Sequence, residues 1–165
     1  MTQTKASEEW VLLAYRLPRV PSTPRSNVWR KLKRLGVAQL ADGLVALPDD
    51  PRTREQLEWI AEEILEHRGE ATIWLGRPAG QGHEAMVARM TAAVAAEYAT
   101  VTADAAQAGA GSATDDPVAR RRATARLRRE LHRIEARDYF PPPERAAARE
   151  AVEGLAGAAA APVTR

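Results

Sequence analysis

"VAQLADGLVALP", residues 37–48, predicts a β-hairpin, and the topology of the N-terminal half follows from it. Two short apolar runs, near 37–41 and 44–47, flank the dipeptide Asp42-Gly43. An Asp-Gly pair between apolar runs is a strong hairpin signal, because both residues tolerate the positive φ that a tight turn requires. The segments on either side of this hairpin then determine the sheet to which it belongs.

The N-terminal side of the hairpin has the pattern of a strand followed by a helix. Residues 10–17, "WVLLAYRL", are too apolar for an exposed edge, which predicts a central strand. Ser22 or Thr23 can cap the helix that follows. Pro24 suits the first position of this helix, and Gly36 suits its C-terminal end.

The C-terminal side adds a second helix and a further strand. Asp50 and Pro51 open a helix that Gly69 closes, and its apolar residues recur every three or four positions. Residues 70–76, "EATIWLG", predict the strand. The order predicts an α/β (α+β) fold: a ferredoxin-like split βαβ with a four-stranded antiparallel sheet, followed by C-terminal helices.

Helices are also predicted beyond the sheet. A helix over 83–106 has an apolar stripe suited to a core or to a second copy of the chain: Val87, Met90, Val94, Tyr98 and Val101. An Ala- and Gly-rich stretch after it favours a linker. We therefore expect a ferredoxin-like domain at 8–80, followed by a packing or dimer helix at 81–107. A linker at 108–116, an Arg-rich helical extension at 117–157 and a disordered tail at 158–165 complete the chain.

Composition narrows the class of protein. The chain has 165 residues, 45% hydrophobic and 28% charged, which is an ordinary soluble balance. Without cysteine it has no disulfide framework and no thiolate metal site. No apolar run approaches the ~20 residues that cross a bilayer, and the N-terminus lacks the pattern of a signal peptide. We expect a cytoplasmic protein that does not enter the membrane.

The charges are strongly segregated, although the net charge is only +2. Residues 10–41 contain seven cations and no acid, residues 42–117 sum to −9, and residues 118–137 sum to +6. Basic surfaces of this kind attract polyanions. The alternative interpretation is a solvated helix face whose cations pair with the acidic middle segment.

The candidate nucleic-acid-binding residues are the cations of the two basic segments. The planar guanidinium of arginine can donate two parallel hydrogen bonds to a phosphate. Such contacts confer affinity without sequence choice. The candidates are Arg16, Arg19, Arg25, Arg30, Lys31, Lys33 and Arg34 in the first segment, and Arg120, Arg121, Arg122, Arg128 and Arg129 in the second.

Patterns typical of catalysis are weak. The three histidines, His67, His83 and His132, have no metal-ligand spacing. The loop "GRPAGQG", residues 76–82, lacks the lysine of a phosphate-binding P-loop. We predict no catalytic residue, no metal and no cofactor, and therefore no enzyme.

The tryptophans are predicted to have different roles. Trp10, Trp59 and Trp74 are expected in or beside the core. Trp29 neighbours the cations and is suited to stacking on a base or packing against a partner helix.

The sequence resembles the N-terminal domain of ChrB, the chromate-resistance regulatory protein family. The resemblance rests on the joint pattern Tyr-Arg-x-Pro, Pro-Ser-x-x-Arg, Trp-Arg-x-Leu-x-x-Leu-Gly and "LVALP", and it covers roughly residues 9–101. It implies a DNA-binding transcriptional regulator that controls a chromate efflux gene. Full ChrB proteins have a further C-terminal domain associated with metal-oxyanion sensing, whereas this chain continues into an Arg-rich helix. Chromate is therefore not expected to bind this chain directly.

A more distant resemblance, in element order and at Tyr15, links the chain to the domain shared by Cas2 and the PaaX-type repressors. It implies a homodimer, which the apolar stripe on 83–106 also favours. Cas2 nucleases have a metal-binding Asp where Arg16 stands here, and a cation cannot ligate a divalent metal. The resemblance therefore does not extend to metal-dependent nuclease chemistry.

These observations predict a non-catalytic DNA-binding regulatory or accessory protein of the chromate-resistance type. The alternative is a protein interaction module whose basic faces bind an acidic partner, and a Cas2-like nuclease relative ranks third.

Overall fold

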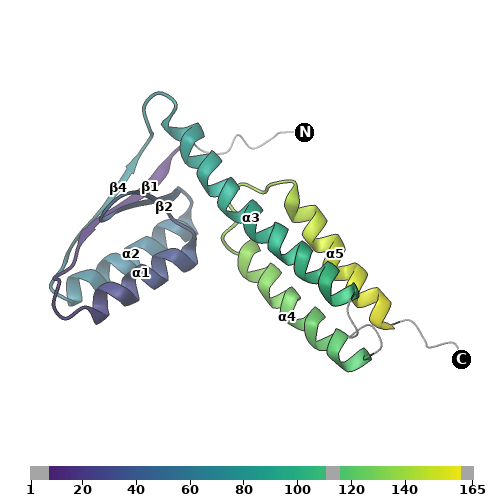
Figure 1. Cartoon of the computed structure of the whole chain (residues 1–165). Helices are drawn as coiled ribbons and strands as arrows, with labels where there is room; N and C mark the ends of the chain where they lie inside the picture. Colours follow the sequence, from purple (N-terminus) through teal and green to yellow (C-terminus); the bar gives the residue numbers. More distant parts are fainter. Residues whose placement is uncertain (1–7, 111–115, 161–165) are drawn as a thin grey trace, which may run out of the picture. The chain divides into compact units, whose positions relative to one another are not determined.

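The structure is a computed structural model, and it describes residues 8–110 and 116–160 (Figure 1). It contains two compact units, Met1–Met90 and Thr91–Arg165, which are described separately. The middle of the predicted linker, 111–115, and the end of the predicted tail, 161–165, lie outside the described residues.

The first unit is built on a four-stranded antiparallel sheet with the strand order β2-β3-β1-β4. Helices α1 and α2 lie on one face of this sheet (Figure 1). The predicted split βαβ fold is therefore confirmed. The elements are β1 Trp10–Arg16, α1 Thr23–Leu35, β2 Ala38–Ala41, β3 Leu44–Pro48, α2 Pro51–Glu66 and β4 Glu70–Gly76.

Local signals account for the ends of the two helices. Asp50 caps α2, because its carboxylate accepts hydrogen bonds from the backbone N–H groups of Arg52 and Thr53. Gly36 ends α1 in the left-handed conformation, at φ 73°. Ser22 is the N-cap residue of α1, but its side chain makes no capping hydrogen bond.

Two glycines let turns approach the end of β1. Gly43 has φ 72°, and a Cβ there would lie 2.3 Å from the carbonyl oxygen of Tyr15. The Tyr15 N–H donates to the Gly43 carbonyl at 2.7 Å. A Cβ at Gly69 would lie 2.6 Å from the carbonyl oxygen of Arg16. Any larger residue at either position would push its turn away from β1.

The predicted roles of the tryptophans are only partly right. Trp10 is buried, at 1% exposure, and its Nε1 donates to His83 Nδ1 at 3.1 Å. Trp59 and Trp74, also expected in or beside the core, are 63% and 60% exposed.

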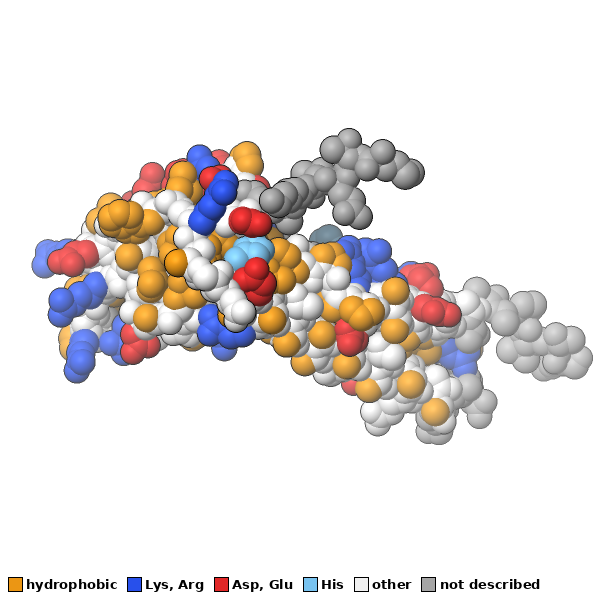
Figure 2. All heavy atoms as spheres, turned by 90° about the horizontal axis from the view of Figure 1, so that it is seen from above, with side chains coloured by type: hydrophobic (Ala, Val, Ile, Leu, Met, Phe, Trp, Pro, Cys, Tyr) orange, Lys and Arg blue, Asp and Glu red, His pale blue; other side chains and the backbone are white. Residues whose placement is uncertain are grey.

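Position within each element explains this difference. Trp59 lies between the buried Leu57 and Ile60, outside the buried stripe of α2. Trp74 pairs with Leu12, and side chains alternate between the faces of a sheet, so it lies on the face opposite α1 and α2. Figure 2 shows hydrophobic side chains exposed over this unit.

The second unit packs the C-terminal part of α3 (Gly82–Ala110) against α4 (Pro117–Glu135) and α5 (Glu144–Ala160). Residues 108–110, predicted as linker, continue α3. Residues 158–160, predicted as disordered tail, have helical backbone. Alanine, the best helix former, explains both extensions. No helix in the described ranges is long and apolar enough to cross a membrane.

The apolar stripe of α3 is used within the chain. Val94, Tyr98 and Val101 are at most 7% exposed and belong to one core cluster with Leu127 and Ile134 of α4. The stripe therefore offers no broad free face to a second copy, which removes one of the two arguments for a homodimer.

Candidate nucleic-acid interface

Four arginines surround one hollow at the end of β1. Arg16 ends β1, Arg19 follows it, Arg25 lies in the first turn of α1, and Arg68 lies between α2 and β4. The hollow has a volume of about 440 Å³, and Glu70 is the acid among its lining residues. The structure thus brings together three predicted site residues and one that the sequence analysis missed.

Strand pairing explains the position of Arg68. Arg16 pairs with Glu70 across β1 and β4, so the residues just before Glu70 lie beside the end of β1. Arg68 has φ 59°, an uncommon conformation for a residue other than glycine. In the sequence, Arg68 belongs to the acidic middle segment, residues 42–117, and its neighbours follow from the antiparallel register.

The charges around this hollow are available to a ligand. Arg16, Arg19, Arg25 and Arg68 are all exposed. Within the described residues, none of the four lies within ion-pair distance of a carboxylate. Their guanidinium groups are therefore not engaged in ion pairs, and Glu70 is the one acid among the described lining residues of the hollow.

The remaining cations of α1 line a second hollow, of about 460 Å³. Lys31 forms an ion pair with Glu63 of α2 at 2.5 Å. Arg30 donates to the side chain of Asn27, and the Lys33 ammonium lies 5.6 Å from the centre of the Trp29 ring. These cations, together with Arg34, form a basic face of α1. Glu63 partly neutralises the charge of this face at Lys31.

The basic segment of α4 is arranged differently, and Arg120 does not belong to an exposed patch. Arg120 is 9% exposed, while Leu127 and Ile134 are fully buried. The three residues are spaced by seven positions, which places Arg120 on the same helix face as the apolar seam. Extending the seam by one further step of seven residues, about two helical turns, towards the N-terminus would have predicted this burial.

Several other cations of α4 are held by ion pairs. The Arg128 guanidinium donates to both carboxylate oxygens of Glu153, at 3.1 and 2.8 Å, and this hydrogen bonding raises the pKa of Arg128. Arg126 pairs with Asp104 at 3.2 Å. Of the candidates on α4, three are exposed and have no ion pair with a described residue: Arg121, Arg122 and Arg129.

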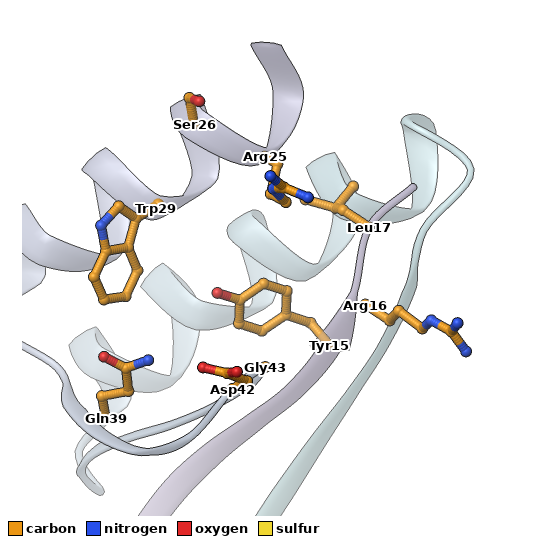
Figure 3. Close-up of a pocket in the computed structure, with 9 residues that line it drawn as sticks. All are labelled: Tyr15, Arg16, Leu17, Arg25, Ser26, Trp29, Gln39, Asp42 and Gly43. Atoms are coloured by element: carbon orange, nitrogen blue, oxygen red, sulfur yellow. The ribbon is translucent and has the colours of Figure 1, made fainter. Parts of the chain in front are cut away.

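A pocket that the sequence analysis did not predict adjoins the four-arginine hollow. It has a volume of about 490 Å³ and is lined by Tyr15, Trp29, Gln39, Asp42 and Arg25, among others. Figure 3 shows the Tyr15 ring between Trp29 and Arg16, with the Gln39 and Asp42 side chains on the other side of the pocket from α1. Burial and the nearby Asp42 carboxylate raise the pKa of Tyr15, so its phenol is neutral at physiological pH.

A metal centre is not apparent in the part of the chain that the structure describes. No group of three or more His, Asp or Glu side chains there is arranged to hold a metal ion.

Fold and surface together define the class of protein: a split βαβ domain with an open arginine cluster at the end of its first strand, joined to a helical unit. The family model for the N-terminal region of protein ChrB matches residues 25–112, just over half of the chain. The chain belongs to this ChrB N-terminal family, which confirms the resemblance found in the sequence.

A relative shows how far the likeness extends. Protein ChrB of Cupriavidus metallidurans (strain CH34) is 30% identical to this chain over 132 residues. The aligned region covers 80% of this chain and 40% of the relative. The chain thus spans well under half of the length of the curated relative that it matches.

Proposed function

We propose that this protein is a DNA-binding regulatory or accessory protein of the chromate-resistance type, without catalytic activity. The observation that carries the proposal is the hollow surrounded by Arg16, Arg19, Arg25 and Arg68, where four exposed guanidinium groups lack an ion pair within the described residues.

Phosphate is the ligand that suits this arrangement best. A guanidinium is always charged and donates in a fixed fork, so several around one concavity can bind the oxygens of a phosphate. The neighbouring cations of α1 extend the positive surface. Most of the affinity would then come from the DNA backbone, and it would depend on salt.

Family membership supports the regulatory part of the proposal. The chain covers 40% of protein ChrB from Cupriavidus metallidurans, so regulation and chromate resistance are proposed here by likeness. The protein would act in the cytoplasm, where DNA is accessible.

An acidic protein partner is the second candidate function. The observation that favours it is that cations of the basic helices already bind carboxylates within the chain, such as Lys31 with Glu63 and Arg128 with Glu153. A carboxylate-rich partner could use the same groups.

A salt series with two polyanions separates the two functions. Affinity for duplex DNA and for polyglutamate is measured between 50 and 300 mM salt, on the order of the range over which counterion release changes binding strongly. Preference for DNA with a steep negative slope of log K against log salt supports DNA binding. Equal affinity for both polymers supports the acidic-partner function and contradicts our proposal.

We also retain the homodimer as a proposal, now based on the edge strand β4 and the distant likeness to PaaX-type repressors. Trp74 and Leu75 of β4 are 60% and 54% exposed, and an open edge strand with exposed apolar side chains favours pairing with a second chain. Sedimentation equilibrium of the full chain, compared with Trp74→Glu, tests this: a monomer at every concentration would contradict it.

A further inference from the structure

The four-arginine hollow and the neighbouring pocket form one continuous surface. Both are lined by Arg16, Leu17 and Arg25. In Figure 3, the Tyr15 ring faces the pocket, and the Arg16 side chain points away from it. A ligand with an anionic part and a planar part could therefore occupy both at once.

The pocket has the composition of a site for a flat, polar ring. Its volume of about 490 Å³ lies within the ~300–1,000 Å³ typical of small-ligand sites. The partly exposed rings of Tyr15 and Trp29 supply stacking surfaces, and the side chains of Gln39 and Asp42 supply hydrogen-bonding groups.

We propose that this pocket accepts an unpaired nucleobase of a DNA strand whose phosphate is bound at the adjacent four-arginine hollow. The inference rests on the proposed function and deepens it, because it names the form of DNA that the site recognises. Bases stack on aromatic side chains irrespective of sequence, whereas a base of a duplex can enter a side pocket only after it has been unpaired and unstacked, which costs free energy.

Asp42 adds a selection among bases. An ionised carboxylate only accepts hydrogen bonds, so it favours a base edge that presents an amino group. Cytosine presents the N4 amino group where thymine presents the O4 acceptor. The pocket is therefore expected to prefer cytosine to thymine, two bases with similar stacking area.

The first experiment measures strand preference. Binding of a single-stranded oligonucleotide and of a duplex of the same length is measured at one salt concentration, for the parent chain and for Trp29→Ala. The parent should prefer the single strand, and Trp29→Ala should lose about tenfold in affinity for it, within the range known for loss of one stacking ring. Trp59→Ala is the matched control, because Trp59 is an exposed tryptophan that lines neither this pocket nor the four-arginine hollow.

The second experiment measures base selection by comparing oligo-dC with oligo-dT. The parent should prefer oligo-dC by about tenfold, the scale of discrimination for one good side-chain contact to a base edge. Asp42→Asn should abolish most of this preference, because an amide both donates and accepts. The hairpin should persist in this variant, since Asn-Gly suits the same turn as Asp-Gly.

The outcomes separate this inference from the proposed function. Tight duplex binding with no single-strand preference, or with Trp29→Ala indistinguishable from Trp59→Ala, would overturn the pocket inference and leave the proposed DNA binding intact. Binding to neither form would overturn both. A cytosine preference that survives Asp42→Asn would contradict the role given to Asp42. Circular dichroism of each variant confirms that altered binding does not result from unfolding.

Discussion

The two basic helices, α1 and α4, resemble each other in sequence but differ in what the structure does with their cations. Four arginines near the start of α1 surround an open hollow. On α4, Arg120 is buried and Arg128 is bound by Glu153 of α5. The comparison shows that the density of cations along a chain does not measure the charge that a partner can reach. The carboxylates of neighbouring elements and the packing of the helix determine it.

The difference between the two helices arises from their neighbours. α4 lies in a unit where α3 and α5 both present acids to it, as Asp104 and Glu153 do. The end of β1 and the start of α1 lie beside the turn that contains Arg68, which adds a cation. A surface salt bridge contributes little to stability, but it occupies the donors that a phosphate would need.

The strongest test of this difference between the hollow and α4 is to remove two arginines from each region. Arg25→Ala with Arg68→Ala should weaken duplex binding about 10- to 100-fold and flatten the slope of log K against log salt by about two units, because two charged phosphate contacts are lost. Arg126→Ala with Arg128→Ala removes the same charge from two ion-paired arginines of α4 and is the matched control. It should change binding much less. Equal effects of both pairs would show that α4 binds DNA as well.

Burial of Arg120 predicts an effect on stability instead of binding. Arg120→Ala should lower the free energy of unfolding by about 1–3 kcal/mol, because the buried aliphatic stem and its polar contacts are lost. Arg120→Met, which keeps most of the stem, should recover part of that loss. Urea denaturation followed by circular dichroism measures both variants. A loss of DNA affinity in folded Arg120→Ala would show that Arg120 contributes to DNA binding after all.

These cases show which parts of the molecule could be predicted from the sequence. The Asp42-Gly43 turn and the Asp50 cap depend on residues within a few positions of each other, so local patterns identified them. Arg68 depends on the pairing of β4 with β1. The pocket beside Trp29 depends on three separate elements that converge only in the folded chain. Single-sequence patterns do not contain such contacts.

The ion pairs of the second unit predict an acid-sensitive contribution to its stability. Arg149 donates to Glu135 at 2.5 Å, and this hydrogen bond is the main cause that lowers the pKa of Glu135 below its ordinary 4.5. A carboxyl whose pKa is lower in the folded state stabilises the fold above the unfolded pKa, and this contribution disappears as pH falls through the folded value. The parent chain should therefore be more stable than Glu135→Gln at pH 7, and the difference should shrink steadily as the pH falls below 4.5. A difference in thermal midpoint that does not depend on pH would contradict this assignment.

The smallest expected effect comes from releasing one cation of α1 from its carboxylate. On α1, Lys31 forms an ion pair with Glu63. Glu63→Gln should therefore free the Lys31 ammonium for a phosphate. If available charge controls DNA binding, this variant should bind DNA a few-fold more tightly and steepen the salt slope by up to about one unit. Glu62→Gln is the matched control, because it removes the same negative charge from an exposed neighbour that has no ion pair among the described residues. A general reduction of repulsion would improve both variants equally, whereas release of Lys31 improves only Glu63→Gln. If the two variants bind alike, local pairing does not limit the DNA affinity of α1, and the contrast between α1 and α4 must have another cause.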